Sequence, residues 1–320
     1  FINNNDNSPV SVSLIQKISA SKYFDLAEVS TYNEGLELLK RNKIDVILSL
    51  PQNFGKDIHT GHETSIAVTL DAINSSKAGI SNNYLQGIIF QFSKEQLTSK
   101  TKIDIIPGIE VINRNWYNPT LDYKVFMVPG ILVILITMIS LFLSSMNIVR
   151  EKEIGTIEQL NVTPIRKYQF IVGKLLPFVV LGIMEFTIGL LIAIFWFKIP
   201  IEGNLPLLYL FTIVYVTLIL GMGMFISTFT NTQQQAMFIA WFFSVIFILM
   251  SGLFTPIESM PVWAQKVADL NPIKYYVEVI RLVMLKGSQF IDVSRQFIII
   301  VIYSAVLNTL AIINYRKTSG

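Results

Sequence analysis

The residues whose types are suited to catalysis or metal binding are few and widely spaced in this sequence. The chain contains no cysteine, which excludes disulfides, thiolate metal sites and cysteine nucleophiles. Its two histidines, His59 and His62, lie in a His-Thr-Gly-His-Glu stretch that we expect to form a turn. A metal site would need a third ligand and a rigid frame. We therefore interpret both histidines as polar loop residues and expect no metal site.

The sequence also lacks the glycine-rich pattern with which ATPases hold phosphate groups. Gly173-Lys174 and Gly55-Lys56 have neither the leading glycine nor the trailing hydroxyl residue of Gly-x-x-x-x-Gly-Lys-Ser/Thr. The long apolar runs contain no Ser/His/Asp set and no paired carboxylates, which argues against a membrane enzyme. We expect no catalytic residue and no cofactor on this chain. If it takes part in active transport, ATP and Mg²⁺ bind to a separate subunit.

The most informative stretch is a charged segment, residues 150–168, that lies between two long apolar runs. The runs at 125–149 and 175–197 are each long enough to cross a hydrocarbon core, which needs about 20 helical residues. Short loops rich in lysine and arginine stay on the cytoplasmic side of a membrane. The basic residues of the segment are Arg150, Lys152, Arg166 and Lys167. We therefore expect the segment to face the cytoplasm.

Within this segment, the spacing of apolar residues predicts a short amphipathic helix at about 151–162. Ile154, Ile157 and Leu160 recur every three residues, and the charged and polar side chains fall mostly elsewhere around the helix: Glu151, Lys152, Glu153, Glu158 and Gln159. Thr163-Pro164 then ends the helix, because a residue before proline is disfavoured in helical conformation. Such a helix either lies on the lipid surface or docks against a partner protein.

The order of residues in this segment resembles a known family. Arg-Glu-Lys-Glu-x-Gly-Thr-x-Glu-Gln-Leu-x-Val-Thr-Pro is similar to the loop between the second and third transmembrane helices of ABC-2 type permeases, the membrane subunits of ABC exporters. The resemblance implies that residues 151–162 are the coupling helix that contacts the ATPase subunit. The residues that it singles out are Glu151, Glu153, Ile154, Gly155, Thr156, Ile157, Glu158, Leu160, Thr163 and Pro164.

Two further stretches carry the same resemblance. Ser-Gly-x-x-x-Pro-Ile-Glu-x-Met-Pro-x-Trp from residue 251, followed by Asn-Pro-x-x-Tyr, occurs in the family's order ahead of the last transmembrane helix. Trp116-Tyr117-Asn118-Pro119 is similar to the stretch before the second helix in the subgroup with a large extracytoplasmic domain. The resemblance implies an ABC ATPase subunit as partner, a second copy or a paralogue, in some systems a periplasmic adaptor protein, and membrane lipid, but no nucleic acid.

The expected fold class is a polytopic α-helical membrane protein with an N-terminal α/β extracytoplasmic domain at 1–124. Apolar residues make up 52% of the chain, and they concentrate in the second part. We expect spans at about 125–149, 170–197, 205–229, 236–254 and 297–315, and an amphipathic segment at about 255–290 half-sunk at the outer membrane surface. The resemblance implies the bacterial cytoplasmic (inner) membrane as location.

The first 124 residues alternate between helix and strand patterns. Helices are expected at 8–21, after Asn33 and at 75–96, and strands at 44–50, 65–73 and 103–112, with a further extended segment at 24–29. This rhythm favours a mixed or parallel sheet covered by helices. If the charged segment faces the cytoplasm, the domain lies outside. We then expect a further transmembrane helix upstream, for six spans in the full protein, and the family has one there too.

Two sets of polar residues fall inside the expected spans. Thr137, Ser140, Ser144 and Asn147 recur every three or four residues and share one helical face. They either pack against another helix or line the translocation path. Glu185 is the one carboxyl group in its apolar run. It is either a structural, hydrogen-bonded residue or part of the path.

The function that these expectations favour is that of a permease subunit, not an enzyme. We expect multidrug efflux of hydrophobic or amphipathic compounds, drug or lipid-like, from the cytoplasm or inner leaflet by a homodimer or paralogue pair. The alternative is a membrane sensor or receptor whose extracytoplasmic domain binds a ligand. The net charge of +3 is small for 320 residues and says nothing about nucleic acid.

Overall fold

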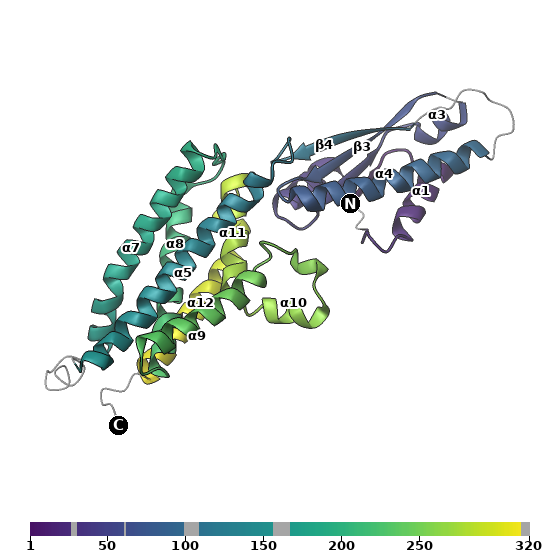
Figure 1. Ribbon diagram of the computed structural model, residues 1–320. Helices are drawn as coiled ribbons and strands as arrows, with labels where there is room; N and C mark the ends of the chain where they lie inside the picture. The colour runs from purple at the N-terminus through teal and green to yellow at the C-terminus, as the bar shows by residue number, and fades with distance from the viewer. Residues whose placement is uncertain (27–30, 61, 99–108, 156–166, 315–320) are drawn as a thin grey trace. The chain divides into compact units, whose positions relative to one another are not determined.

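The computed structural model describes residues 1–26, 31–60, 62–98, 109–155 and 167–314 (Figure 1). The chain divides into two units, Phe1–Phe126 and Met127–Gly320. The sequence placed this boundary at 124–125, and the structure places it two residues later. Each unit has its own elements and is described by itself.

The first unit is built on a four-stranded mixed sheet in the order β1-β2-β3-β4. The strands are β1 (Ile2–Asn4), β2 (Val46–Leu50), β3 (Thr64–Asp71) and β4 (Ile109–Trp116). β1 and β2 are parallel, β2 and β3 antiparallel, and β3 and β4 parallel. The expected strands at 44–50 and 65–73 correspond to β2 and β3. The last strand runs four residues past its predicted end, and residues 103–108 lie outside the described residues.

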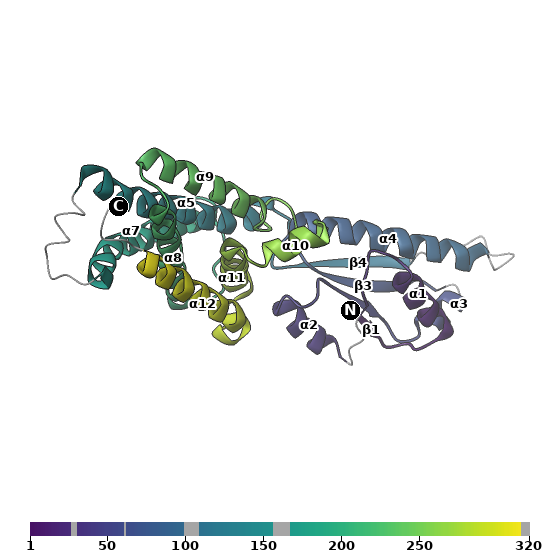
Figure 2. The same ribbon diagram turned by 90° about the horizontal axis from the view of Figure 1, so that it is seen from below.

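Helices cover both faces of this sheet (Figure 2). They are α1 (Pro9–Ser19), α2 (Tyr32–Lys40), α3 (Phe54–Thr60) and α4 (Ser75–Thr98). Side chains alternate along a strand, so Leu48 joins the core formed with α1, α3 and α4, whereas Ile47 packs with Leu39 of α2 on the other face. The short β1 and α3 were not predicted, because three and seven residues carry too little periodicity to be recognised.

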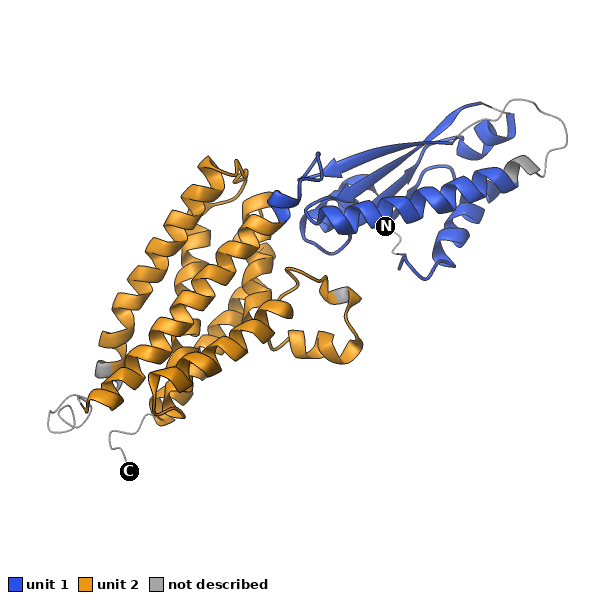
Figure 3. Ribbon diagram, in the orientation of Figure 1, with its two compact units in different colours: residues 1–126 blue, residues 127–320 orange. Residues whose placement is uncertain are grey.

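The second unit, orange in Figure 3, is a helical bundle. Its helices are α5 (Tyr123–Ile154, entering from the first unit), α7 (Lys167–Phe195), α8 (Leu205–Thr228), α9 (Gln233–Leu249), α10 (Val262–Ala268), α11 (Pro272–Lys286) and α12 (Phe290–Asn314), with a short 3₁₀ turn η1 (Ile257–Ser259). Four are long and apolar enough to cross a membrane: α5, α7 from Ile171, α8 and α12. α8 has the largest buried share of these four, so it forms the centre of the unit.

Two expected spans differ in extent from the helices found. The span expected at 236–254 corresponds to the 17-residue α9, which begins three residues earlier, ends at Leu249 and is shorter than the four long helices. Gly252 adopts a positive φ of 79° just beyond it, a conformation that glycine tolerates and that cannot continue a helix. The last helix begins at Phe290, seven residues before the predicted start of its span.

The segment at about 255–290 was expected to lie half-sunk at the outer membrane surface. Its longest helix, α11, is instead buried within the second unit. Asn271 caps it, accepting from Ile273 N–H at 3.0 Å and donating to the Phe247 carbonyl at 2.6 Å, so α11 begins beside the end of α9. Tyr276 is fully buried, bonds Thr212 of α8 at 2.6 Å and stacks on Tyr215. The prediction was wrong here because α11 packs its apolar face against α8 within the protein, whereas a half-sunk surface helix would place that face in lipid. α10, with Trp263 70% exposed, lies at the surface of the unit.

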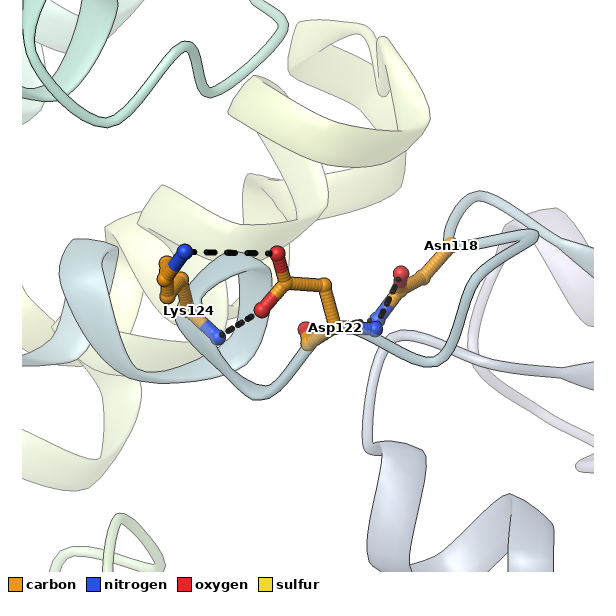
Figure 4. A network of polar contacts seen from close by, with 3 residues as sticks. All are labelled: Asn118, Asp122 and Lys124. Carbon is orange, nitrogen blue, oxygen red and sulfur yellow. Dashed lines mark hydrogen bonds and ion pairs between the residues drawn. The ribbon is translucent and has the colours of Figure 1, made fainter.

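A polar turn precedes α5 within the first unit (Figure 4). The buried Asn118 side chain both accepts from Asp122 N–H and donates to the Asp122 carbonyl, each at 2.9 Å. Asp122 in turn caps α5 by accepting from Lys124 N–H at 3.0 Å. Burial raises the pKa of the neighbouring Tyr117 to about 12, so that hydroxyl stays protonated near neutral pH. The Asn-Pro stretch therefore fixes the start of the first long helix.

Candidate functional site

Three consecutive side chains at the end of α5 hold three other helices. Glu151 forms an ion pair with Lys174 of α7 at 2.5 Å. The Lys152 ammonium donates to the Ser227 carbonyl at 2.5 Å and to the Thr230 carbonyl at 3.1 Å, at the end of α8. Successive residues of a helix project about 100° apart, so one turn reaches three neighbours. We call Glu151, Lys152 and Glu153 the α5 latch.

Glu153, the third member of the α5 latch, binds the start of α9. Its carboxylate accepts from the Gln233 backbone N–H at 2.8 Å and from the Gln233 side-chain amide at 2.5 Å. Gln233 is the first residue of α9, and Thr232 caps the same end by accepting from Gln235 N–H. A negative charge at a helix N-terminus is favourable, because the unpaired N–H groups there carry partial positive charge.

The charge of Lys152 is matched to its helix end in the same way. The last carbonyl groups of α8 have no partner within the helix, and a cation satisfies them and complements the helix dipole. Both ends of the α8–α9 turn are thus tied to a single turn of α5. A displacement of that turn would move α7, α8 and α9 together.

The residues predicted for the coupling helix divide into two groups in the structure. Glu151, Glu153 and Ile154 continue α5, and Gly155 follows with a positive φ of 77°, which glycine tolerates at a helix end. The helix predicted over 151–162 therefore begins as a direct continuation of α5. The remaining predicted residues lie outside the described residues: Thr156, Ile157, Glu158, Leu160, Thr163 and Pro164.

The sequence did not reveal the partners of the α5 latch. Lys174, Ser227, Thr230 and Gln233 were not predicted as site residues. Lys152 and Ser227 are 75 positions apart, so only the bundle topology brings them together. The signal that was present is the uncharged polar turn at 230–235 between two apolar runs, which offers free helix ends to a charged side chain.

The polar stripe on α5 packs against α8. Thr137 Oγ1 lies 2.5 Å from the Tyr215 hydroxyl, and Ser144 Oγ donates to the Leu220 carbonyl at 2.6 Å. Ser140 is buried with them. One atom of Asn147, Oδ1, is buried without a hydrogen-bond partner within the described part of the chain. This arrangement agrees with the helix-packing interpretation of the stripe.

We expect the Thr137–Tyr215 pair to contribute only modestly to stability. Tyr215→Phe should lower the free energy of unfolding by about 0.5–1 kcal/mol, because interhelical hydrogen bonds in membrane proteins are weak and Thr137 also donates to the Val133 carbonyl. Thermal unfolding of Tyr215→Phe, Thr137→Val and the double variant measures the coupling. Thr217→Val is the control, since the Thr217 hydroxyl donates to the Ile213 carbonyl of its own helix and the substitution leaves the backbone unchanged. A loss several times larger in Tyr215→Phe alone would contradict this estimate.

The other predicted polar residues are not brought to the α5 latch. One carboxyl oxygen of Glu185, in the middle of α7, is buried without a hydrogen-bond partner among the described residues. His59 lies in the last turn of α3 instead of the expected turn, and His62 Nδ1 is 2.7 Å from Thr60 Oγ1. In the described ranges, no group of three His, Cys, Asp or Glu residues is placed to hold a metal ion.

Comparison with known proteins gives a consistent set of relatives. The family model described as ABC-2 family transporter protein matches residues 2–313. The probable multidrug ABC transporter permease YbhR of Escherichia coli K12 is 32% identical over 313 residues, covering 98% of this chain and 84% of YbhR. YbhS of the same organism, also named a probable multidrug ABC transporter permease, is 28% identical over 88% of this chain and 75% of its own. The inner membrane transport permease YhhJ is 27% identical over 92% and 78%, respectively. No solved structure matches the chain.

Proposed function

The chain belongs to the ABC-2 family of transporter proteins, and on that premise we propose that it is the permease subunit of an ATP-driven exporter of hydrophobic or amphipathic compounds. Its four long apolar helices are those of a multi-pass membrane protein. YbhR and YbhS are named as probable multidrug permeases, which supports drug-like cargo. The observation that carries the proposal is the α5 latch, which connects three helices to the start of the segment that resembles a coupling helix.

The route of the free energy follows from where ATP binds. The sequence has no Gly-x-x-x-x-Gly-Lys-Ser/Thr pattern, so hydrolysis, with its ATP and Mg²⁺, takes place on a separate ABC ATPase subunit. Its work enters through contact with residues 156–164 and reaches the end of α5. The α5 latch then moves α7, α8 and α9 against the rest of the bundle, switching it between inward-open and outward-open states.

The same premise defines the assembly. Two ATPase subunits need two coupling contacts, so a second copy of this chain or a paralogue completes the transporter. The first unit then lies on the outer side of a bacterial inner membrane, where an adaptor protein can extend the path. Exposed apolar side chains along α7, such as Leu176, Met184 and Ile188, contact membrane lipid.

Transport by inside-out membrane vesicles tests the proposed function. Vesicles that contain the chain and its ABC ATPase should accumulate an uncharged hydrophobic dye when ATP is added, and vanadate should stop the accumulation. Vesicles with a catalytically inactive ATPase are the control. Dye accumulation that depends on the proton gradient and not on ATP would contradict the proposal. So would a protein whose sole activity is the ATP-independent binding of a ligand by the first unit.

The function of Glu185 is tested in the same vesicles. We expect Glu185→Gln to leave export of uncharged compounds intact, because the amide preserves the volume and polarity of a structural residue within α7. Export rates of an uncharged and a cationic dye are compared at equal expression. Loss of both activities with normal expression would show that the carboxyl group is required.

A further inference from the structure

A cavity of about 480 Å³ lies within the second unit between α8, α9 and α12. The α8 wall includes Phe225 and Phe229, the α9 wall Phe243 and Phe247, and α12 contributes Tyr303 and Leu307. This volume is in the range of small-molecule sites, which are mostly apolar with a few polar groups. The cavity is partly open at the surface of the unit, so a molecule from outside can enter it.

The lining determines the chemistry of the occupant. Among the described residues that form the cavity, none is charged and only Tyr303 carries a hydroxyl. That hydroxyl lies 3.5 Å from the Asp269 carbonyl, at the end of the cavity where α11 begins. An ion would lose its hydration here without gaining a counter-charge. The cavity therefore suits an uncharged molecule with one hydrogen-bonding group at most.

The aromatic walls favour a ring over a flexible chain. Phe225 and Phe229 are arranged edge to face with centroids 5.0 Å apart, and Phe243 and Phe247 are tilted at 6.1 Å. Flat rings gain from such edge and face contacts. An acyl chain would gain less and would lose the rotational freedom of each bond that becomes fixed. A rigid aromatic compound is thus the better fit.

The cavity borders an exposed apolar surface of the bundle, which faces lipid in the membrane location proposed above. Phe229 is 67% exposed and Phe243 39% exposed, and the neighbouring Phe238 and Trp241 of α9 are exposed as well. A compound dissolved in the bilayer can therefore reach the cavity without crossing water. Apolar cavities stay dry and accept hydrophobic ligands.

We propose that this cavity, between the phenylalanine pairs of α8 and α9, binds one small uncharged aromatic compound taken up from the membrane. Lys152 fixes the end of α8 next to Phe229, and Glu153 fixes the start of α9. One turn of α5 thus sets the separation of the two walls. Movement of the α5 latch then widens or narrows the cavity. The identification of the bound compound as cargo rests on the proposed function, whereas the binding itself does not.

Photolabelling tests the site in the assembled transporter in lipid nanodiscs without ATP. The probe is phenyldiazirine, an uncharged aromatic photolabel, and the competitor is phenylnaphthylamine. We expect label on the α8 and α9 walls that the competitor removes. Label on Met184 and Ile188, which face lipid from α7, should resist competition. Because no nucleotide is present, this result is independent of ATP-driven export.

A cavity-filling variant provides the second arm. Leu307→Trp should reduce the competable label by about tenfold, because a larger side chain occupies the ligand's space. Ile188→Trp on the lipid face of α7 makes the same kind of change outside the cavity and should leave the label unchanged. If the Leu307→Trp protein fails to assemble, the competition between phenylnaphthylamine and the photolabel in the unaltered protein still tests the proposal. The α8 and α9 label could instead resist the competitor, as the α7 label does. That result would show that the probe reaches these residues from bulk lipid, and it would overturn the proposal.

Discussion

Replacing Glu153 with lysine should abolish transport-coupled ATP hydrolysis and leave the protein folded in the membrane. Both carboxylate oxygens accept hydrogen bonds from Gln233, and an ammonium group has no acceptor. The new positive charge would also be repelled by the N-terminus of α9. Stimulation of the ATPase by a transported compound should fall about tenfold or more, as expected when a coupling contact between two sites is lost. The measurement is ATP hydrolysis by the assembled transporter with and without that compound.

Two controls separate this effect from a change of net charge. Glu110→Lys makes the same reversal on β4 of the first unit, at an exposed position, and should leave coupling unchanged. Glu153→Gln keeps an oxygen that can accept from Gln233 N–H, so it should retain part of the stimulation. We expect Glu158→Lys, in the segment that precedes Thr163-Pro164, to abolish coupling as well. Normal coupling in both lysine variants, at 153 and 158, would remove the case for this segment.

Among the substitutions proposed, Gly223→Leu should lower the stability of the protein most. A Cβ atom at this position would lie 2.8 Å from the Leu141 carbonyl oxygen and 2.8 Å from Ser144 Cβ. α5 and α8 would have to separate, which breaks the Ser144–Leu220 hydrogen bond. Overpacking at a helix contact should lower the midpoint of thermal unfolding by roughly 5 °C or more. Intrinsic tryptophan fluorescence of the purified protein, followed during heating, measures this midpoint.

The matched control is Gly173→Leu on α7. A Cβ there meets nothing within 4 Å, and leucine favours a helix over glycine by about 0.7 kcal/mol. This variant should unfold at the same temperature as the unaltered protein or slightly above it. Equal midpoints for the two leucine variants would show that α5 and α8 do not approach closely at Gly223.

The sequence predicted the elements whose length or periodicity is set locally. Long uncharged runs specify α5, α7, α8 and α12, because the hydrocarbon core demands that length. Alternation and turn residues located β2 and β3 in the same way. The failures are elements decided by packing. α11 has the pattern of a surface helix, and the contacts of Tyr276 with Thr212 and Tyr215 of α8 account for the burial of that side chain.

Two of the three α5 latch residues, Glu151 and Glu153, were named as site residues from the sequence, but their contacts were not predicted. The Glu-Lys-Glu sequence at 151–153 was assigned to a surface that faces a partner. In the structure, these side chains bind residues of the same chain, and Glu153 and Gln233 are 80 positions apart. Periodicity along one helix cannot report which neighbour each side chain reaches. The apolar cavity was missed for the same reason, since its walls come from three separate helices.

Site-specific cross-linking tests the central claim, that the segment after α5 receives work from an ATPase subunit, most directly. The chain contains no cysteine, so Ile157→Cys and Glu158→Cys each introduce a single thiol without a background to remove. We expect both thiols to react with a cytoplasmic thiol reagent and to cross-link to the ABC ATPase, whereas Glu110→Cys in the first unit does neither. Reaction of positions 157 and 158 only from the outer side, or no cross-link to the ATPase in active transporter, would contradict the account.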